Sequence, residues 1–496
     1  MDQKKTKVLI ISIISTAAVI IGACMIYIFA ASKPAAKPSD AVVNLPSDAP
    51  LSPTGEENDA NQTTKPLPEE TMDEQQNHTI QPLPEQSAGG QQNQTAPPSE
   101  TGAGSSTVTP EGVQLVTIES IADEKIYNVR SYGAKGDGAA DDTEAIRAAL
   151  DAAYKAGKAV VYFPSGTYRI TDTITLARND GKILAMKGNT NTRIVGALDQ
   201  DMFVVEMKYN FFVSNIRFEH QGTKGKIFDA LFLVASNCSF ANAEENQSSI
   251  VRFAGSNCKI EHCTFTGSNK TAYALEYSKR EVAGESQISI NDYIVSNVFQ
   301  GTGRGILVNT TELNTRVEGL KIGGNHFSNT GSEQVTIETI LHCDVYNNVM
   351  EGSRDTAVLI RSRGLAVDGL FVYNNTISAG EACIKVADTN SGVITVSNNT
   401  LSDSPYGFYM ISQQSQTLGI FQNRFNGMTK AGVYLWPKGS STMVSENAFS
   451  DMSNVTAVRI ISPQDGFVVV ADNVLGGALT DIQTDTAAKS VVTNNR

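Results

Sequence analysis

Short alternations of apolar and polar residues recur along the carboxy-terminal three quarters of this chain, and an asparagine precedes many of them. The segments VYNNVMEGSRDTAVLIRS, VYNNTISAGEACIKVAD, VSNNTLSDSPYGFYMIS and FQNRFNGMTKAGVYLWP begin at Val345, Val372, Val396 and Phe421. In each segment a large apolar residue lies two positions after the asparagine, and a short strand pattern follows some ten positions later. This self-similarity predicts an architecture of stacked, equivalent units.

The recurring asparagine is expected to be structural. Its eleven intervals average about 25 residues, which suits one coil of a three-sided parallel β-helix. An asparagine at a tight turn adopts the left-handed backbone easily, and its amide can bond to the same side chain one rung away, about 4.8 Å distant. The residue two positions beyond is expected to point into the core, and Cys238 and Cys263 take the ladder position in early coils. The column is read as Asn215, Asn237, His262, Asn297, Asn325, Asn348, Asn375, Asn399, Asn423, Asn447, Asn473 and Asn495.

The block from Tyr127 to Thr171 supports the same fold. Tyr127 to Tyr132 is predicted as a strand and Gly133 to Gly138 as a turn, and Asp141 and Glu144 have capping-box spacing at the start of a helix. This block resembles the amino-terminal signature of pectate-lyase-like and polygalacturonase-like (rhamnogalacturonase/epimerase-like) right-handed β-helix families. The resemblance implies an all-β, right-handed parallel β-helix of about 12 coils over residues 113–496, with residues 127–171 as a capping block that carries a short helix.

The resemblance does not extend to the catalytic motifs of polygalacturonases. Those enzymes carry Asn-Thr-Asp, Asp-Asp, Gly-His-Gly and Arg-x-Lys in successive coils, and none of these occurs in the repeat region. The Asp-Asp pair of this chain, Asp141-Asp142, falls in the capping block. Hydrolysis of polygalacturonate by that mechanism is therefore not expected.

The amino terminus predicts export. Residues 1–7 carry three lysines and precede an uncharged apolar run, residues 8–31, that is long enough to span a bilayer. We expect a cytoplasmic tail, a single-pass membrane anchor, and an extracytoplasmic body joined to it by a disordered linker, residues 32–112, rich in Pro, Ser, Thr and Gln. Lipidation at Cys24 after cleavage, or complete secretion after cleavage near Ala30, are alternatives that also export the body.

The overall charge indicates which classes of partner the chain does not attract. With 39 Lys and Arg against 52 Asp and Glu, the chain has a formal charge of -13 and offers nucleic acid no general attraction. The five cysteines of the body lack metal-ligand spacing and are expected to be free core thiols. A monomer that binds a polysaccharide is expected, with no certain cofactor.

The last strand of each coil is predicted to present two outward columns, because side chains alternate with period two. The first column reads Leu307, Thr336, Leu359, Lys385, Tyr409, Tyr434 and Arg459. The second reads Asn309, Glu338, Arg361, Ala387, Ile411, Trp436 and Ile461. From these columns we take Glu338, Arg361, Lys385, Tyr409, Tyr434 and Trp436 as substrate-binding candidates, with the aromatic residues forming a platform for sugar rings. Glu338 with Arg361 can equally be a structural ion pair.

Glu333, Asp355 and Glu381 precede three consecutive strands and are the catalytic candidates. Stacking would bring them within about 5 Å per rung, where like charges raise one another's pKa or recruit a cation. In a glycoside hydrolase they would act as acid and base, whereas a polysaccharide lyase would use them to bind Ca²⁺. A non-catalytic glycan- or wall-binding protein is the alternative. A second cluster in an insertion, with Glu276, Tyr277, Lys279, Arg280, Glu281 and Glu285, either forms a wall of the binding cleft or is a solvated loop.

Overall fold

The computed structural model describes part of the chain, and the account below concerns that part alone. The described residues are 125–178, 182–207, 211–268, 270–278, 289–309, 317–362, 367–387, 392–411, 417–436, 441–452, 454–461, 467–476, 480–484 and 489–496. The chain divides into the units Met1–Glu100 and Thr101–Arg496, and the described residues belong to the second. The predicted tail, anchor and linker lie outside them. No helix within the described ranges is long and apolar enough to cross a membrane.

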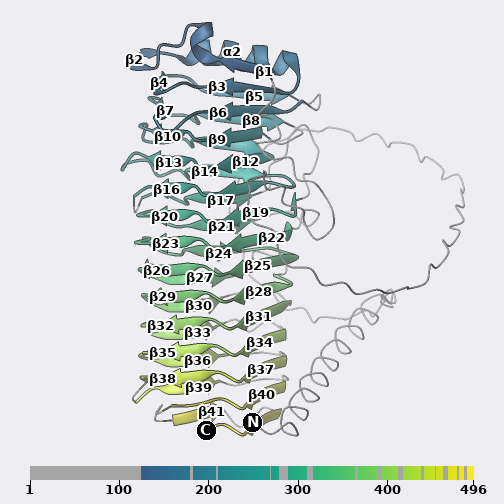
Figure 1. Cartoon of the computed structure of the whole chain (residues 1–496). Helices are drawn as coiled ribbons and strands as arrows, with labels where there is room; N and C mark the ends of the chain where they lie inside the picture. The colour runs from purple at the N-terminus through teal and green to yellow at the C-terminus, as the bar shows by residue number, and fades with distance from the viewer. Residues whose placement is uncertain are drawn as a thin grey trace, which may run out of the picture. The chain divides into compact units, whose positions relative to one another are not determined.

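The described chain winds into a right-handed parallel β-solenoid of about 12 coils with very little helix (Figure 1). Each coil contributes one strand to each of three parallel sheets, which confirms the predicted fold class. Within the described residues sheet 1 has 16 strands, and sheets 2 and 3 have 13 each.

Sheet 1 contains β1 (Lys125–Asn128), β3 (Ala159–Tyr162), β6 (Leu184–Lys187), β9 (Phe211–Ser214), β12 (Leu233–Ser236), β15 (Lys259–Glu261), β18 (Ser289–Ile290), β19 (Tyr293–Val295), β22 (Val317–Gly323), β25 (His342–Tyr346), β28 (Leu370–Tyr373), β31 (Val393–Ser397), β34 (Thr417–Phe421), β37 (Ser441–Ser445), β40 (Phe467–Ala471) and β42 (Lys489–Thr493). Sheet 2 contains β2 (Asp137–Asp141), β4 (Gly166–Ile170), β7 (Thr192–Gly196), β10 (Arg217–His220), β13 (Ser239–Asn242), β16 (Thr264–Thr266), β20 (Val298–Gln300), β23 (His326–Ser328), β26 (Val349–Ser353), β29 (Thr376–Ala379), β32 (Thr400–Ser402), β35 (Arg424–Asn426) and β38 (Ala448–Ser450). Sheet 3 contains β5 (Ile174–Arg178), β8 (Phe203–Met207), β11 (Phe228–Leu231), β14 (Val251–Ala254), β17 (Leu275–Ser278), β21 (Ile306–Asn309), β24 (Val335–Ile337), β27 (Thr356–Ile360), β30 (Ala382–Val386), β33 (Tyr406–Met410), β36 (Ala431–Leu435), β39 (Thr456–Ile460) and β41 (Thr480–Thr484).

The amino-terminal block differs in detail from the sequence prediction. After β1, Val129–Tyr132 form a 3-10 helix where a continuous strand was expected. Helix α2 (Thr143–Ala156) begins after Asp142, whose side chain makes no capping bond, so the expected Asp141–Glu144 capping box is wrong. The Asp141 carboxylate instead accepts from the Thr143 backbone N–H at 3.0 Å. α2 lies at the amino-terminal end of the solenoid (Figure 1) and packs against β1 and β3.

The core consists of identical side chains stacked rung on rung. Phe265, Phe299 and Phe327 lie two positions after the ladder position in successive coils, and their ring centroids are 4.9 and 4.6 Å apart with nearly parallel planes. Each is completely buried. Because stacked strands repeat every 4.7–4.9 Å, one side chain per rung at the same register fills the interior continuously. The predicted inward rung is thereby confirmed.

The sequence analysis assigned both the left-handed turn and the stacked amide to one residue per coil. In the structure, two adjacent residues share these roles. Asn348, Asn375 and Asn399 are each about 1% exposed, and each side-chain amide donates to the Oδ1 of the next asparagine at 2.9 to 3.0 Å. The left-handed backbone belongs to the residue before, as at Asn347 and Asn374, whose φ angles are 53° and 57°.

Three members of the predicted column, Asn215, Asn237 and His262, therefore belong to the left-handed position. The ladder begins one coil after them, where the Cys263 backbone N–H donates to the Asn297 Oδ1 at 2.9 Å. A buried ladder residue satisfies backbone groups, whereas its neighbour only turns the chain. The five body cysteines are free and buried, as predicted.

Candidate functional site

The outward face of sheet 3 carries the predicted first column in the predicted register. Leu307 is paired with Thr336, Leu359 with Lys385, and Tyr409 with Tyr434. The backbone hydrogen bonds between coils continue past the strands of sheet 3 into the second column. There the Arg361 N–H donates to Ile337 O and the Trp436 N–H donates to Met410 O. Alternation along each strand and parallel stacking thus suffice to bring these residues together.

The first three members of the first column are nevertheless buried. Leu307 and Leu359 are 8% and 6% exposed, and Thr336 is completely buried. The Thr336 hydroxyl has no hydrogen-bond partner within the described ranges. Such a group costs about 1–3 kcal/mol and calls for an explanation. Nothing in the sequence distinguished Thr336 from a threonine on the exposed face of an ordinary strand.

Asp355 and Glu381 are direct neighbours across two rungs. The Glu381 backbone N–H donates to Asp355 O at 2.7 Å, and the Thr356 hydroxyl lies 3.3 Å from both Asp355 Oδ1 and Glu381 Oε2. Lys385 lies in β30, four residues after Glu381, and its Nζ is 2.6 Å from Glu381 Oε2. Two carboxyls and an ammonium group therefore form one connected cluster.

Glu333 is not in register with those two acids. Counting back from the Val335–Val358 pair places Glu333 opposite Thr356, one position beyond Asp355. Its Oε2 accepts from Arg304 Nε at 2.7 Å, and the residue is only 9% exposed. The expectation of three acids in one column is therefore wrong, because coils differ in length by single residues at this corner.

The three acids differ in pKa. Burial and the adjacent Glu381 raise the pKa of Asp355. Burial also opposes ionisation of Glu381, but hydrogen bonds from Lys385 and Asp355 outweigh it and lower its pKa. For Glu333, hydrogen bonds from Ser332 and Arg304 likewise outweigh burial and lower the pKa. The opposite directions of the two shifts mean that a proton shared by the pair favours Asp355 over Glu381.

Glu338 and Arg361 form an ion pair across neighbouring rungs. Arg361 Nε and Nη2 lie 3.0 and 2.8 Å from Glu338 Oε1, and Glu338 is 1% exposed. Of the two interpretations of this pair, the structural one fits a buried carboxylate held by a guanidinium. Arg361, with a side chain 32% exposed, remains on the surface of the face.

An aromatic cluster lies on the carboxy-terminal side of the acids. Tyr406, which the sequence analysis missed, stacks on Tyr409 at 4.2 Å, and Tyr434 meets Tyr409 edge-on at 5.3 Å. Lys385 lies 5.6 Å from the Tyr409 ring centroid, and Arg459 lies 5.8 Å from that of Tyr434. Trp436 is 38% exposed two positions after Tyr434. Tyr406 is the first residue of β33, where it pairs with Ala382 and Ala431.

The second predicted cluster is dispersed. Glu276 and Tyr277 belong to β17 and not to an insertion. Glu276 accepts from the Ser249 and Ser278 hydroxyls at 2.9 and 3.1 Å, and Tyr277 is buried and donates to the Asp292 carboxyl. Lys279, Arg280, Glu281 and Glu285 lie outside the described residues.

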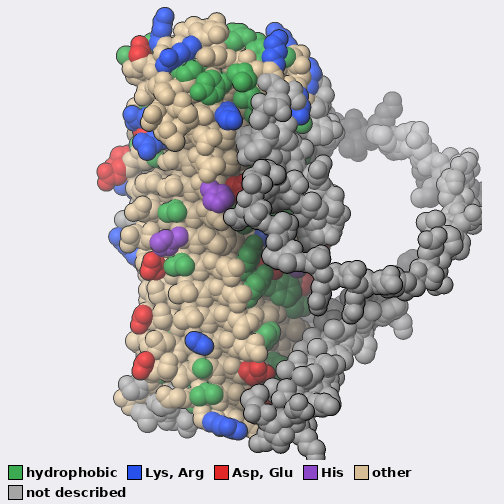
Figure 2. Space-filling view, in the orientation of Figure 1, with side chains coloured by type: hydrophobic (Ala, Val, Ile, Leu, Met, Phe, Trp, Pro, Cys, Tyr) green, Lys and Arg blue, Asp and Glu red, His purple; other side chains and the backbone are tan. Residues whose placement is uncertain are grey.

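In the described part of the chain, no group of three or more His, Cys, Asp or Glu side chains is arranged to hold a metal ion. The outer acids of the candidate site face cationic side chains instead: Glu333 faces Arg304, and Glu381 faces Lys385. The surface in Figure 2 carries charges of both signs, interspersed over the face shown.

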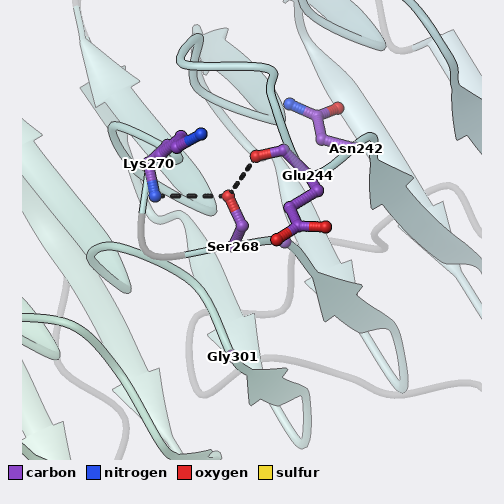
Figure 3. Close-up of a pocket in the computed structure, with 6 residues that line it drawn as sticks. Asn242, Glu244, Ser268, Lys270 and Gly301 are labelled. Atoms are coloured by element: carbon purple, nitrogen blue, oxygen red, sulfur yellow. Dashed lines mark hydrogen bonds between the residues drawn. The ribbon is translucent and has the colours of Figure 1, made fainter.

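A polar pocket of about 490 Å³ lies elsewhere, beyond the ends of β13, β16 and β20. Figure 3 shows Ser268 between Glu244 and Lys270: its hydroxyl donates to Glu244 O at 2.6 Å and accepts from the Lys270 N–H at 3.2 Å. These bonds close the local turns. The pocket is lined by Asn242, Glu244, Gly267, Ser268, Lys270 and Gly301, and it includes no predicted site residue.

Comparison with known proteins yields two family models. The family described as rhamnogalacturonase A/epimerase, pectate lyase-like, matches residues 126–331. The family described as periplasmic copper-binding protein (NosD) matches residues 294–462.

Curated relatives match over short segments. Mannuronan C5-epimerase AlgE2 of Azotobacter vinelandii is 38% identical over 116 residues, which is 20% of this chain and 12% of that protein. Alginate lyase 7 of the same organism is 51% identical over 71 residues, which is 14% of this chain and 8% of that protein. The matched segments thus span only about a tenth of these relatives.

Solved structures match the chain at low identity. The surface adhesin PfbA of Streptococcus pneumoniae has a TM-score of 0.48 at 16% identity, over 75% of this chain and 91% of that one. The A-module of mannuronan C-5 epimerase AlgE6 of Azotobacter vinelandii has a TM-score of 0.44 at 16% identity, over 75% and 99%. Three parallel sheets wound in one direction and the match of residues 126–331 confirm the predicted resemblance to the pectate-lyase-like right-handed β-helix superfamily.

Proposed function

We propose that this β-helix acts on a polysaccharide and cleaves its glycosidic bonds at the face of sheet 3. The observation that carries the proposal is the pair formed by Asp355 and Glu381, two carboxyls bridged by the Thr356 hydroxyl, with the pKa of one raised and that of the other lowered. Carboxyl pairs whose pKa values are pushed apart are suited to acid and base roles.

In this mechanism Asp355 donates its proton to the leaving glycosidic oxygen. Glu381 attacks the sugar carbon as nucleophile, and water then releases the sugar with Asp355 as base. Retaining glycosidases hold their two carboxyls about 5 Å apart, so the sugar must break the hydrogen bond between Asp355 and Glu381 as it enters between them. Lys385 holds Glu381 ionised, and Glu333 keeps Arg304 at the edge of the site.

A lyase version uses the same face differently. There Lys385 would take a proton beside a uronate carboxylate, and the acids would bind Ca²⁺. The 2.6 Å contact between Lys385 and Glu381 engages the ammonium group with an anion, which favours the hydrolase version.

The relatives support a polysaccharide as the substrate. Their names refer to mannuronan, alginate and, for a probable glucan endo-1,3-beta-glucosidase of Arthroderma benhamiae, a glucan. The proposal includes residues 8–31 as an uncleaved membrane anchor that holds the body outside the cell, with lipidation at Cys24 or complete secretion as the alternatives.

The test is turnover of a polysaccharide panel by the full chain and two variants, Asp355→Asn and Glu381→Gln. Asp344→Asn lies in the same coil as Asp355 but on sheet 1, and Glu351→Gln lies on sheet 2, so both are matched controls. We expect new reducing ends from the wild type and both controls, and a loss of at least a hundredfold in the two site variants at unchanged melting temperature. Unsaturated sugar ends, lost on chelation, would instead indicate the lyase. Full activity of both site variants would refute the site.

Passive glycan binding is the second candidate. It is favoured by one observation, that Glu333 and Glu381 are each neutralised by a basic side chain, as in structural ion pairs. Binding across the panel without any turnover, equal in wild type and Asp355→Asn, would establish it.

A further inference from the structure

The corner column of the candidate site extends towards the amino terminus beyond the acids. Leu275 is paired with Ile306, and Ile306 with Val335. Tyr273, Arg304 and Glu333 lie two residues before these three, so they occupy equivalent positions in successive coils. The backbone agrees, since the Ala274 N–H donates to Arg304 O at 2.9 Å. Tyr273 and Arg304 therefore stand in line with Glu333, along the solenoid axis.

Arg304 is both held in place and accessible. Its Nε lies 2.7 Å from Glu333 Oε2, and its guanidinium carbon lies 5.6 Å from the Tyr273 ring centroid. The side chain is 43% exposed, so part of the guanidinium faces solvent. A guanidinium fixed by a carboxylate and an aromatic ring is preorganised to bind a further carboxylate.

The Tyr273 phenol extends along the axis towards the acids. Burial raises its pKa, and the charges of Arg304, Glu333 and Arg361 act on it. Arg361 follows β27, three coils further along than β17, which Tyr273 precedes. The phenol thus reaches the buried Thr336 hydroxyl, which has no partner in full hydrogen-bond geometry among the described residues.

The opposite side of the acids carries the same combination of side chains. There Tyr406, Tyr409 and Tyr434 lie beside Lys385 and Lys430, and Lys430 lies 5.3 Å from the Tyr406 ring centroid. Six rungs separate the coil of Tyr273 from that of Tyr434, about 29 Å at 4.8 Å per rung. Counted from the coil of Tyr273, the coils of Asp355 and Glu381 are the third and fourth, so the two acids lie near the middle of this distance.

We propose that Tyr273 and Arg304 form a second sugar-binding subsite, selective for an acidic sugar residue, and that an acidic polysaccharide lies along the solenoid axis across Asp355 and Glu381. The chain is then cleaved internally, because sugars are bound on both sides of the acids. The Tyr273 ring packs on the sugar ring, and Arg304 binds the sugar carboxylate. This inference rests on the proposed function for cleavage, but the binding subsite is independent of it.

The binding arm of the test uses the full chain carrying Asp355→Asn, so that turnover does not interfere, with alginate and a neutral β-1,3-glucan as probes. We expect added Tyr273→Ala or Arg304→Gln to weaken alginate binding at least tenfold and to leave the glucan unaffected. Tyr293→Ala and Lys321→Gln remove an equivalent ring–cation pair, 5.6 Å apart, on sheet 1 and are the matched controls. Equal affinity of Tyr273→Ala and its Tyr293→Ala control would overturn the subsite. If Tyr273→Ala fails to fold, the alginate affinity of the surface variant Arg304→Gln tests the subsite by itself.

The cleavage arm uses the active full chain on long alginate and on alginate oligomers of increasing length. We expect fragments of intermediate size at early times, and a KM that falls with oligomer length in the wild type but not in Arg304→Gln. Release of only the terminal sugar would overturn the internal cleavage. Absence of any turnover together with weakened binding in Tyr273→Ala would remove the proposed function and leave the subsite established.

Discussion

Replacing Asn399 with alanine should destabilise the solenoid from its centre. The Asn399 amide donates to Val372 O at 2.9 Å, to Ser397 O at 3.0 Å and to Asn423 Oδ1 at 2.9 Å. Its Oδ1 accepts from the backbone and side-chain nitrogens of Asn375, both at 2.9 Å. All five contacts are lost in the variant, and the residue is 1% exposed, so water does not replace them.

The expected cost is on the order of 3 kcal/mol in the free energy of unfolding. The largest part comes from the Asn375 backbone N–H, which is left buried and unsatisfied at about 1–3 kcal/mol. The remaining lost bonds contribute about 0.5–1.5 kcal/mol each, partly recovered as the site relaxes.

Asn495→Ala is the matched control. Asn495 makes the same bonds at the last coil, donating to Val470 O at 3.1 Å and accepting from the Asn473 N–H at 3.1 Å, but it is partly exposed. Water can replace its bonds, so we expect a loss below about 1 kcal/mol.

Urea unfolding followed by circular dichroism measures both variants, and hydrogen exchange tests whether protection is lost around the 375–423 coils. Solenoids can unfold in segments, so the exchange data guard against a two-state assumption. A cost of Asn399→Ala no greater than that of Asn495→Ala would contradict the ladder argument. Lost activity at an unchanged melting temperature would equally refute a purely structural role.

The remaining predictions concern pH, a buried hydroxyl and topology. Burial raises the pKa of Asp292 to about 8, so the contribution of this group to stability is largest below about pH 4 and falls by up to about 1.4 kcal/mol per unit as pH rises from about 4 to 8. Asp292→Asn should remove this contribution from the pH dependence of the melting temperature. Turnover should fall at low pH as Glu381 is protonated and at high pH as Asp355, its pKa raised, loses its proton; a pH-independent kcat would contradict the assignment. Thr336→Val should stabilise by about 1 kcal/mol, since it removes an unsatisfied hydroxyl, and a loss of stability in urea unfolding would show that the hydroxyl has a partner. Protease added to intact cells should release a compact fragment that begins near residue 115, whereas a protected body would refute export.

The candidate site shows where sequence reasoning stops. Lys385, Tyr409 and Tyr434 were aligned correctly because they lie inside strands, where period two and one rung per coil determine both direction and neighbour. Glu333 was misaligned because it lies at a corner, where single-residue differences in coil length shift the register. Tyr273 and Arg304 were missed because they lie at corners, before β17 and β21, and meet only in the folded chain, 31 residues apart. Tyr406 lies in β33, but before the residues that were aligned, so its contacts with Tyr409 and Tyr434 were not considered.

The repeating pattern of the chain is sufficient for its architecture. Apolar residues with period two and an asparagine in successive coils specify three-sided stacking, because each buried asparagine oxygen accepts from the asparagine one rung away. The tertiary structure alone decides which acid holds a proton. Asp355 and Glu381 are the same chemical group, and their pKa values diverge only because the fold brings Lys385 to one of them and leaves the other beside its neighbour's charge.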